Sequence, residues 1–167
     1  MRGKFMQEAV ENEVLHSYEA MYRMAYTYVN NEPDAMDIVQ ESVYKAIRNY
    51  KTVKKESYIK TWLFKIVVNT ALDFIRKGKK EIQVESIFET GAEDTYKDFD
   101  TLEALNVLSE KEKTVIMLRF FEDRKLDEVA AILDLNISTV KSLLYRSLKK
   151  LKVELMEGEK DYEQQPT

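Results

Sequence analysis

Apolar side chains recur at helical spacing along most of this 167-residue chain. Residues three and four apart share one face of an α-helix, so the pattern predicts helices and not strands. The N-terminal half shows three such segments, at residues 14–29, 34–50 and 58–77. Polar residues separate the first two segments, and Pro33 suits the first helical turn of the second. The lysine-rich residues 51–56 form a loop before the third segment.

A capping box marks the start of a helix in the C-terminal part of the chain. Ser109 and Glu112 have the required spacing, in which each side chain accepts a hydrogen bond from a backbone N–H of the other residue. We also expect helix over residues 101–108. Residues 81–100 have weak periodicity and many acidic side chains, which predicts an acidic linker.

Residues 126–157 have the layout of a helix-turn-helix, with a short helix over 126–133, a tight turn over 134–136 and a longer basic helix. Asn136 is the expected N-cap of the long helix, with Ser138 as the alternative. Such a helix can enter the major groove of DNA. An ordinary helix pair with a solvated basic face is the alternative interpretation. The side chains expected to contact DNA are Ser138, Thr139, Lys141, Ser142, Tyr145, Arg146 and Lys149.

These segments together predict an all-α protein made of two small helical domains. The first domain is expected over residues 1–80 and the second over 101–157, joined by the acidic linker over 81–100. Residues 158–167 are expected to be disordered, because short polar ends of domains usually are.

Charge is distributed in blocks along the chain, although the net charge is only −4. Residues 14–80 carry 12 Lys or Arg against 7 Asp or Glu, and residues 138–152 carry 5 basic residues and no acid. Residues 81–100 carry 7 acids and one base. Attraction to phosphates depends on local charge, so the two basic blocks are compatible with a DNA-binding protein.

Composition argues against several other classes of protein. The chain has no Cys, and therefore no disulfide and no thiolate metal site. It has no apolar run near the ~20 residues that span a bilayer, no phosphate-binding Gly-rich loop and no GxSxG motif. The one histidine, His16, is interpreted as a surface or boundary residue. We therefore expect a cytoplasmic protein that is not an enzyme, with no metal, cofactor or small-molecule substrate.

The third predicted helix has an aromatic side chain on its polar face. Trp62 lies there with Lys65, Asn69 and Arg76, opposite an apolar face that includes Phe64. An indole in such surroundings can stack on an exposed nucleic-acid base while nearby lysines follow the phosphates. Packing of Trp62 beneath a neighbouring helix is an alternative of equal weight.

Two segments of the N-terminal domain resemble region 2 of the extracytoplasmic-function (ECF) sigma factors of the sigma-70 family. Residues 34–41 (DAMDIVQE) resemble the segment that binds RNA polymerase in that family. Residues 62–66 (WLFKI), followed by Asn69, Asp73 and Arg76, resemble the helix that melts the promoter.

The C-terminal segments continue the resemblance. Residues 126–130 (LDEVA), 139–142 (TVKS) and 144–146 (LYR) resemble region 4 of the same family. The resemblance covers about residues 18–155, and within the family the chain is similar to the sigma-V-like branch of Gram-positive bacteria. It implies an alternative sigma factor, whose region 2 recognises the opened −10 element and whose region 4 reads the −35 element as duplex DNA.

The resemblance also implies two sets of site residues in region 2, and three partners. The expected surface for core RNA polymerase is Asp37, Ile38, Gln40, Glu41 and Tyr44. The side chains expected to capture the −10 strand are Lys51, Lys54, Lys55, Tyr58, Trp62, Lys65, Asn69 and Arg76. The partners implied are core RNA polymerase, promoter DNA and an anti-sigma factor, which in this family is often membrane-anchored.

Two positions depart from the family pattern. Leu143 stands where the family often has Arg, which removes one possible phosphate or base contact, and Ser138 stands where Gly is common. A stand-alone helix-turn-helix regulator, which would normally bind a palindrome as a dimer, is the main alternative function. A helical module that binds only proteins is a further alternative.

Overall fold

The structure is a computed structural model that describes residues 2–81 and 102–163, with side chains for residues 2–78 and 102–153. All regular structure in these ranges is helical, which confirms the predicted fold class. The chain divides into two compact units, which we describe separately. The expected acidic linker lies outside the described residues, except for Glu81. No helix in the described part is long and apolar enough to cross a membrane.

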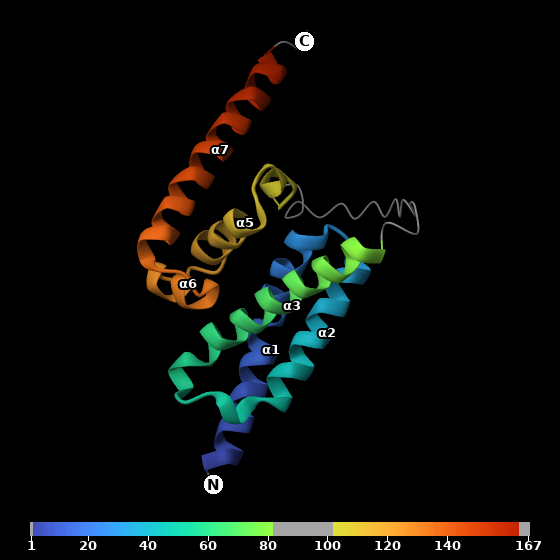
Figure 1. The fold of residues 1–167 in the computed structure, drawn as a ribbon, viewed down its shortest axis with the longest axis vertical. Helices are drawn as coiled ribbons and strands as arrows, with labels where there is room; N and C mark the ends of the chain where they lie inside the picture. The colour runs from blue at the N-terminus through green and yellow to red at the C-terminus, as the bar shows by residue number, and fades with distance from the viewer. Residues whose placement is uncertain (1, 82–101, 164–167) are drawn as a thin grey trace. The chain divides into compact units, whose positions relative to one another are not determined.

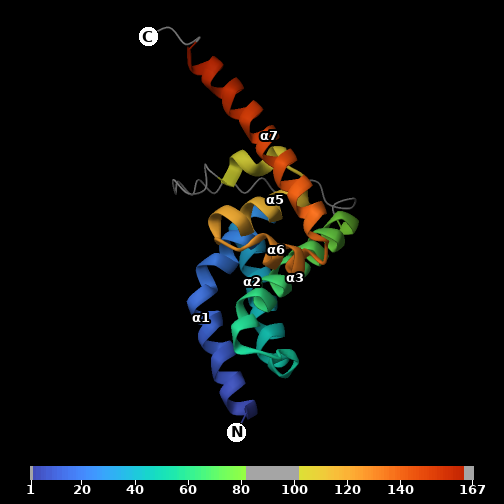
Figure 2. The same ribbon diagram turned by 90° about the vertical axis from the view of Figure 1, so that its left-hand side faces the viewer.

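Three long helices form the N-terminal unit: α1 (Arg2–Val29), α2 (Glu32–Arg48) and α3 (Ile59–Glu81). Each of them packs against the other two (Figures 1 and 2). Large side chains from all three helices are completely or almost completely buried, among them Met21, Ile38 and Phe64. Full burial of a side chain of this size stabilises the folded state by about 1.5–3 kcal/mol. This shared core fixes the positions of the surfaces and loops around it.

Short polar connections set the ends of these helices. Asn30 has a φ of 58°, and the side chain of Asn31 caps α2 by accepting a 2.9 Å hydrogen bond from the backbone N–H of Asp34. Pro33 lies in the first turn of α2, as predicted. The loop between α2 and α3 contains two single 3-10 turns, η1 (Tyr50–Thr52) and η2 (Glu56–Tyr58).

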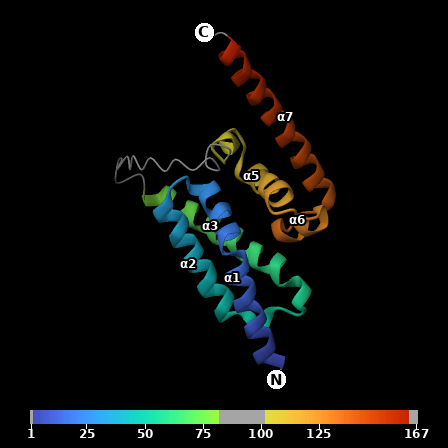
Figure 3. The ribbon, with the colours of Figure 1, turned by 180° about the vertical axis from the view of Figure 1, so that it is seen from behind.

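The C-terminal unit contains shorter elements and one long helix. In chain order they are η3 (Ala104–Val107), α5 (Glu110–Ile116), the π turn η4 (Met117–Phe121), α6 (Leu126–Leu133) and α7 (Ile137–Glu163). Both η3 and α5 pack against α7 (Figures 1 and 3). Val115, Leu118 and Val140 are among the completely buried side chains of this unit.

An ion pair between a buried carboxylate and a partly exposed lysine joins α5 to α7. Ser109 and Glu112 form the predicted capping box, in which Ser109 N–H donates to Glu112 Oε1 at 2.9 Å. The Glu112 side chain is only 1% exposed, and its Oε1 also lies 2.8 Å from Lys150 Nζ. Burial disfavours the ionised carboxylate, but the hydrogen bonds from Lys150 and Ser109 and the charge of Lys150 outweigh it. They hold the pKa of Glu112 below its ordinary value of 4.5.

Two helices are longer than the apolar pattern predicted. α1 begins at Arg2 and buries Val10, although residues 2–13 lack a regular apolar stripe. α7 continues to Glu163, so the prediction of disorder is wrong for residues 158–163, while 164–167 lie outside the described residues. Glu, Lys, Gln and Met, which favour helix, make up half of residues 2–13, and Glu and Lys make up half of residues 158–163. The expected helix over 101–108 contains the short 3-10 turn η3.

Candidate nucleic-acid interface

A tight turn sets the geometry of the helix-turn-helix. Asp134 has a φ of 56°, and Leu135 N–H donates to the Ala130 carbonyl at 3.0 Å. Asn136 Oδ1 accepts a 2.8 Å hydrogen bond from Thr139 N–H, which confirms Asn136 as the N-cap of α7. Figure 3 shows α6 at the end of α7 where α7 begins. The Thr139 hydroxyl also donates to Asn136 Oδ1, at 2.8 Å, so its proton is already used in the cap.

One face of α7 presents all the side chains that the sequence indicated for duplex DNA. Tyr145 is 80% exposed, and the others on this face are exposed as well. Val140 and Ser147 are completely buried on the opposite side of the helix. This face therefore offers Arg, Lys, Tyr and hydroxyl groups together, and residues 138–152 contain no acid.

Leu143 lies on the buried side of α7, although the resemblance to the family suggested a position that contacts DNA. Its side chain is 8% exposed and belongs to the buried side of α7. The expected loss of a DNA contact therefore does not affect the exposed face. Leu148 of the same helix is 43% exposed.

Trp62 borders a pocket in the N-terminal unit, which we call the Trp62 pocket. Its volume is about 330 Å³, and Trp62 is partly buried in its wall. Lys45 Nζ donates a 3.1 Å hydrogen bond to Thr70 Oγ1 there. Trp62 is thus neither a fully buried packing residue nor a purely solvated one. The pocket is lined by Lys45, Asn49, Thr52, Trp62, Ile66, Asn69 and Thr70.

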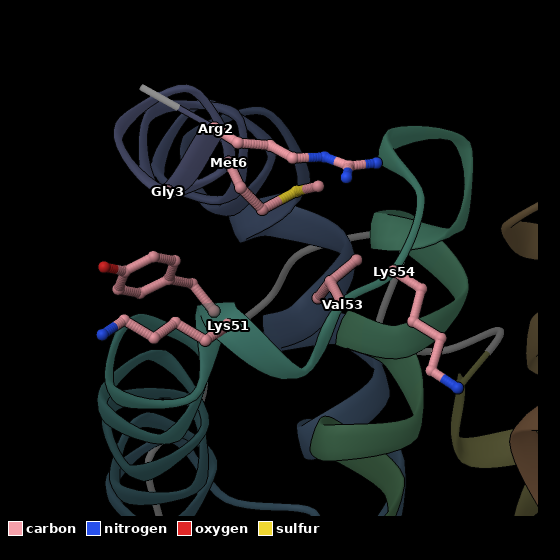
Figure 4. A pocket seen from close by; sticks show the side chains of 7 residues that line it. Arg2, Gly3, Met6, Lys51, Val53 and Lys54 are labelled. Carbon is pink, nitrogen blue, oxygen red and sulfur yellow. The ribbon is translucent and has the colours of Figure 1, made fainter.

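The loop lysines do not share this pocket with Trp62. Lys51 and Lys54 line a separate pocket together with Arg2 and Met6 of α1 (Figure 4). The remaining members of the expected strand-capture set line neither pocket; Lys55, Tyr58 and Arg76 are exposed, and Lys65 is partly buried. The structure therefore places four of the eight predicted residues in two separate pockets, which share the α2–α3 loop, and the other four outside both.

The sequence did not indicate several residues of these pockets. Lys45 lies in the last turn of α2, and Asn49 follows four residues later as the C-cap of that helix; this spacing was the available signal for a second polar stripe. The contribution of Arg2 has no local signal, because it depends on the packing of the start of α1 near a loop some fifty residues later.

A charged face of α2 carries four of the five residues expected to contact core polymerase. Asp37, Gln40, Glu41 and Tyr44 are exposed, and the Arg48 guanidinium lies 6.0 Å from the centroid of the Tyr44 ring. The fifth residue is a correction. Ile38 is completely buried, because it falls on the inward side of the same helix, so its side chain is not available to a partner.

Comparison with known proteins agrees with these two units. Residues 14–81 match the family described as Sigma-70 region 2, and residues 99–151 match Sigma-70, region 4. The chain is 49% identical over 138 residues to the RNA polymerase sigma factor SigV of Bacillus subtilis, covering 80% of this chain and 83% of that protein. It is 32% identical over 133 residues to the ECF RNA polymerase sigma-E factor of Haemophilus influenzae, covering 68% and 70% of the two chains.

A solved structure has the same fold. It is that of the sigma factor RpoE in complex with the anti-sigma factor NepR from Bartonella quintana, with a TM-score of 0.74, 28% identity and coverage of 87% of this chain and 96% of that one. The chain belongs to the sigma-70 family, as an ECF sigma factor similar to SigV. It is an alternative sigma factor, a transcription initiation factor that directs RNA polymerase to promoters.

Proposed function

We propose that this sigma factor divides promoter recognition between its two units, with region 4 reading duplex DNA at the −35 element. The observation that carries this proposal is the exposed, acid-free face of α7, presented by a turn that Asn136 caps. Arg146 and the hydroxyl side chains suit base edges in the major groove, whereas Lys141 and Lys149 suit phosphates.

The N-terminal unit is proposed to capture the opened strand of the −10 element. The Trp62 pocket supports this role, because it combines an indole with the amide side chains of Asn49 and Asn69 and with Lys45. Aromatic side chains bind unstacked bases by stacking, and amides can form hydrogen bonds to base edges. The exposed loop lysines near it would attract the phosphates of the same strand.

The exposed face of α2 is proposed to bind core RNA polymerase. Asp37, Gln40, Glu41 and Tyr44 lie on one side of the helix and combine two acids, an amide and an aromatic ring. Such a face suits a partner helix with basic side chains. Bacterial RNA polymerase works in the cytoplasm, so the same proposal places this chain there.

An anti-sigma factor is the third proposed partner. The structurally similar RpoE forms a complex with the anti-sigma factor NepR, and the likeness extends over 87% of the present chain. We propose that a protein of this kind binds the chain and keeps it from polymerase, and that it is membrane-anchored as in many members of the family.

Sedimentation of the purified chain, with and without core RNA polymerase, tests the proposed function. A sigma factor should sediment as a monomer alone, should co-sediment with core polymerase, and should bind promoter DNA tightly only in that complex. A dimer that binds a palindromic site without polymerase would instead indicate a stand-alone regulator. A monomer that binds neither polymerase nor DNA would contradict both functions.

A further inference from the structure

A pocket of the C-terminal unit lies beside the ion pair that joins α5 to α7. We call it the Val153 pocket. Its volume is about 420 Å³, and it is lined by Val107 of η3 and by Arg146, Lys149, Lys150 and Val153 of α7. The pocket thus combines two apolar side chains with three cations, and none of its described lining residues is acidic.

We propose that Lys150 is a site of covalent acylation and that the Val153 pocket holds the reagent, a short-chain acyl phosphate such as acetyl phosphate. The phosphate of the reagent would lie against Arg146 and Lys149, and its acyl chain against the two valines. This arrangement brings the carbonyl carbon to the Lys150 amine. The proposal goes beyond promoter recognition and does not depend on the role proposed for either unit.

Lys150 combines access from solvent with a nearby proton acceptor. Its side chain is 44% exposed, so a small reagent can reach it. An ammonium group must lose a proton before its nitrogen can attack a carbonyl, and Glu112 Oε1 lies 2.8 Å from Lys150 Nζ. Although burial opposes ionisation, the pKa of Glu112 lies below 4.5, so the carboxylate is ionised at neutral pH and able to accept a proton.

The reaction is a simple acyl transfer. Lys150 Nζ attacks the carbonyl carbon of the acyl phosphate, the new C–N amide bond forms, and the C–O bond to the phosphate breaks. The ammonium loses two protons in all. One passes to Glu112 Oε1 and from there to solvent, and the other leaves with the phosphate as hydrogen phosphate. No oxidant or reductant takes part, and the protein loses the positive charge of Lys150.

The placing of the cations favours an acyl phosphate over a coenzyme A thioester, which carries the same acyl group. Arg146 lies four residues before Lys150 and therefore on the same face of α7, and Lys149 is the adjacent residue. In an acyl phosphate the phosphate is attached directly to the acyl group, so these cations hold it beside the reacting carbon. In the thioester the phosphates lie at the far end of a long arm, where the same cations do not align the carbonyl.

Acylation at this position has a structural consequence, because Lys150 neutralises a buried carboxylate. The Glu112 side chain is 1% exposed, and its Oε2 is buried with no hydrogen-bond partner in the part of the chain that the structure describes. An acylated Lys150 has no charge and leaves this carboxylate without its cation, which is strongly destabilising. Acylation would therefore loosen the contact between α5 and α7 in the unit that carries the exposed face of α7.

Reaction of the full-length chain with acetyl phosphate at neutral pH, followed by mass spectrometry at each lysine, tests the proposal. Lys141 and Lys152 are internal controls, because both are exposed on α7 and neither lines the pocket. Lys150 should react about tenfold faster than either control, since the reagent and the proton acceptor are positioned there. In the urea-denatured chain the three rates should be equal. Equal rates in the folded chain would overturn the proposal.

Two substitutions and a second reagent sharpen this test. Glu112→Gln removes the proton acceptor and Arg146→Gln removes part of the phosphate site, so each should reduce the advantage of Lys150, whereas Lys141→Gln should not. Arg146 is exposed, so Arg146→Gln should fold even if Glu112→Gln does not. An advantage that persists in Arg146→Gln would overturn the proposal. So would a preference for Lys150 that appears with acetyl-coenzyme A and not with acetyl phosphate.

A final measurement tests the structural consequence. Acetyl-lysine is placed at position 150 during synthesis of the full-length chain, and at position 152 in the matched control. Circular dichroism should show that the C-terminal unit melts about 10 °C lower with acetyl-lysine at 150, and almost unchanged with acetyl-lysine at 152. Equal melting of the two modified chains would overturn the structural effect assigned to acylation of Lys150.

Discussion

The two units of the chain present their proposed DNA-contacting side chains on surfaces of opposite shape. In the N-terminal unit, Trp62 and Asn69 line a pocket between packed helices, and Lys51 and Lys54 line another. In the C-terminal unit the corresponding side chains project from one helix, where Tyr145 is 80% exposed. An unstacked base can be enclosed by a pocket, whereas paired bases can be reached only by an element that enters a groove.

The units also differ in how they are held together. The N-terminal unit has three helices of 28, 17 and 23 residues that share an apolar core. In the C-terminal unit, α5 and α6 have only 7 and 8 residues, and a buried carboxylate forms part of the contact between α5 and α7. Both units therefore have an apolar core, but in the C-terminal unit the contact between two helices also depends on an ion pair with a buried carboxylate.

The largest expected effect is a loss of stability when the ion pair of the C-terminal unit is broken. Lys150→Met should leave the buried Glu112 without its cation, and loss of one partner of a buried pair costs about 3–5 kcal/mol of stability. We expect the lower end, because Lys150 is 44% exposed. Lys149→Met is the matched control and should cost little, since Lys149 is exposed. Trp62 is the only Trp in the chain, so its fluorescence reports unfolding of the N-terminal unit alone.

Circular dichroism, Trp62 fluorescence and the pH dependence of stability together test whether the loss is confined to the C-terminal unit. Circular dichroism should show a lower melting temperature for part of the helix signal, while the fluorescence transition stays unchanged; equal shifts would mean that the units do not unfold independently. Because the pKa of Glu112 is lowered in the folded protein, its stabilising effect is present above 4.5 and is lost as the pH falls through the lowered value. The deficit of Lys150→Met should therefore shrink in acid, where Glu112 becomes neutral.

The second prediction concerns the exposed face of α2, which is proposed to bind core polymerase and not DNA. Asp37→Lys combined with Glu41→Lys should weaken association with core polymerase by about 2–5 kcal/mol, if these acids form close pairs with basic partner residues. The fold should survive, because both side chains are exposed. Glu8→Lys with Glu11→Lys, which reverses two exposed acids of α1, is the matched control for net charge. Equal retention of polymerase by both double variants in a pull-down would place the binding surface elsewhere.

The third prediction tests whether the Trp62 pocket acts on an opened strand. Trp62→Ala should reduce affinity for the captured strand by about 1–3 kcal/mol, the usual contribution of stacking on one base. Transcription from a duplex promoter should fall, and a promoter with a pre-melted −10 bubble should partly restore it. Thermal stability should change less than for a fully buried Trp, whose loss costs about 3–5 kcal/mol. A large loss of stability with equal defects on both templates would make Trp62 a packing residue.

The smallest effects are expected on the exposed face of α7, where two neighbouring basic residues should behave differently. Arg146→Ala should cost about 1–3 kcal/mol and relax the preference for bases in the −35 element, if Arg146 makes a bidentate base contact. Lys149→Ala should weaken binding to all sequences and lower the salt slope by roughly one. Transcription from a panel of −35 variants measures the difference. An unchanged preference in Arg146→Ala would mean that another face of α7 enters the groove.

Signals that act within a few residues allowed much of the fold to be predicted from the sequence. The capping box at Ser109 and the cap at Asn136 depend on side chains three residues from the groups they satisfy. The bounds of α6 follow from a regular apolar stripe between polar turns. Such signals do not depend on where the rest of the chain lies, which is why they were sufficient.

The sequence was insufficient in two cases: where the position of a residue around its helix decides whether it is buried, and where distant segments of the chain come into contact. Ile38 and Leu143 stand inside or beside family motifs, but the turn of the helix directs both toward the core. The pocket that Arg2 and Lys51 line, and the contact of Glu112 with Lys150, each join segments more than thirty residues apart, and neither has a periodic signal. Packing decides which of many basic side chains come together, and periodicity alone does not specify packing.

The unbroken length of α7 has a mechanical consequence. Its 27 residues form a rod about 40 Å long, at ~1.5 Å per residue. This rod is held within its unit by packing against η3 and α5, by completely buried side chains such as Val140 and Ser147, and by the contact of Lys150 with Glu112 about 20 Å beyond the capped turn at Asn136. The buried side chains lie on the side of α7 opposite its exposed face, so they fix the orientation of that face within the unit.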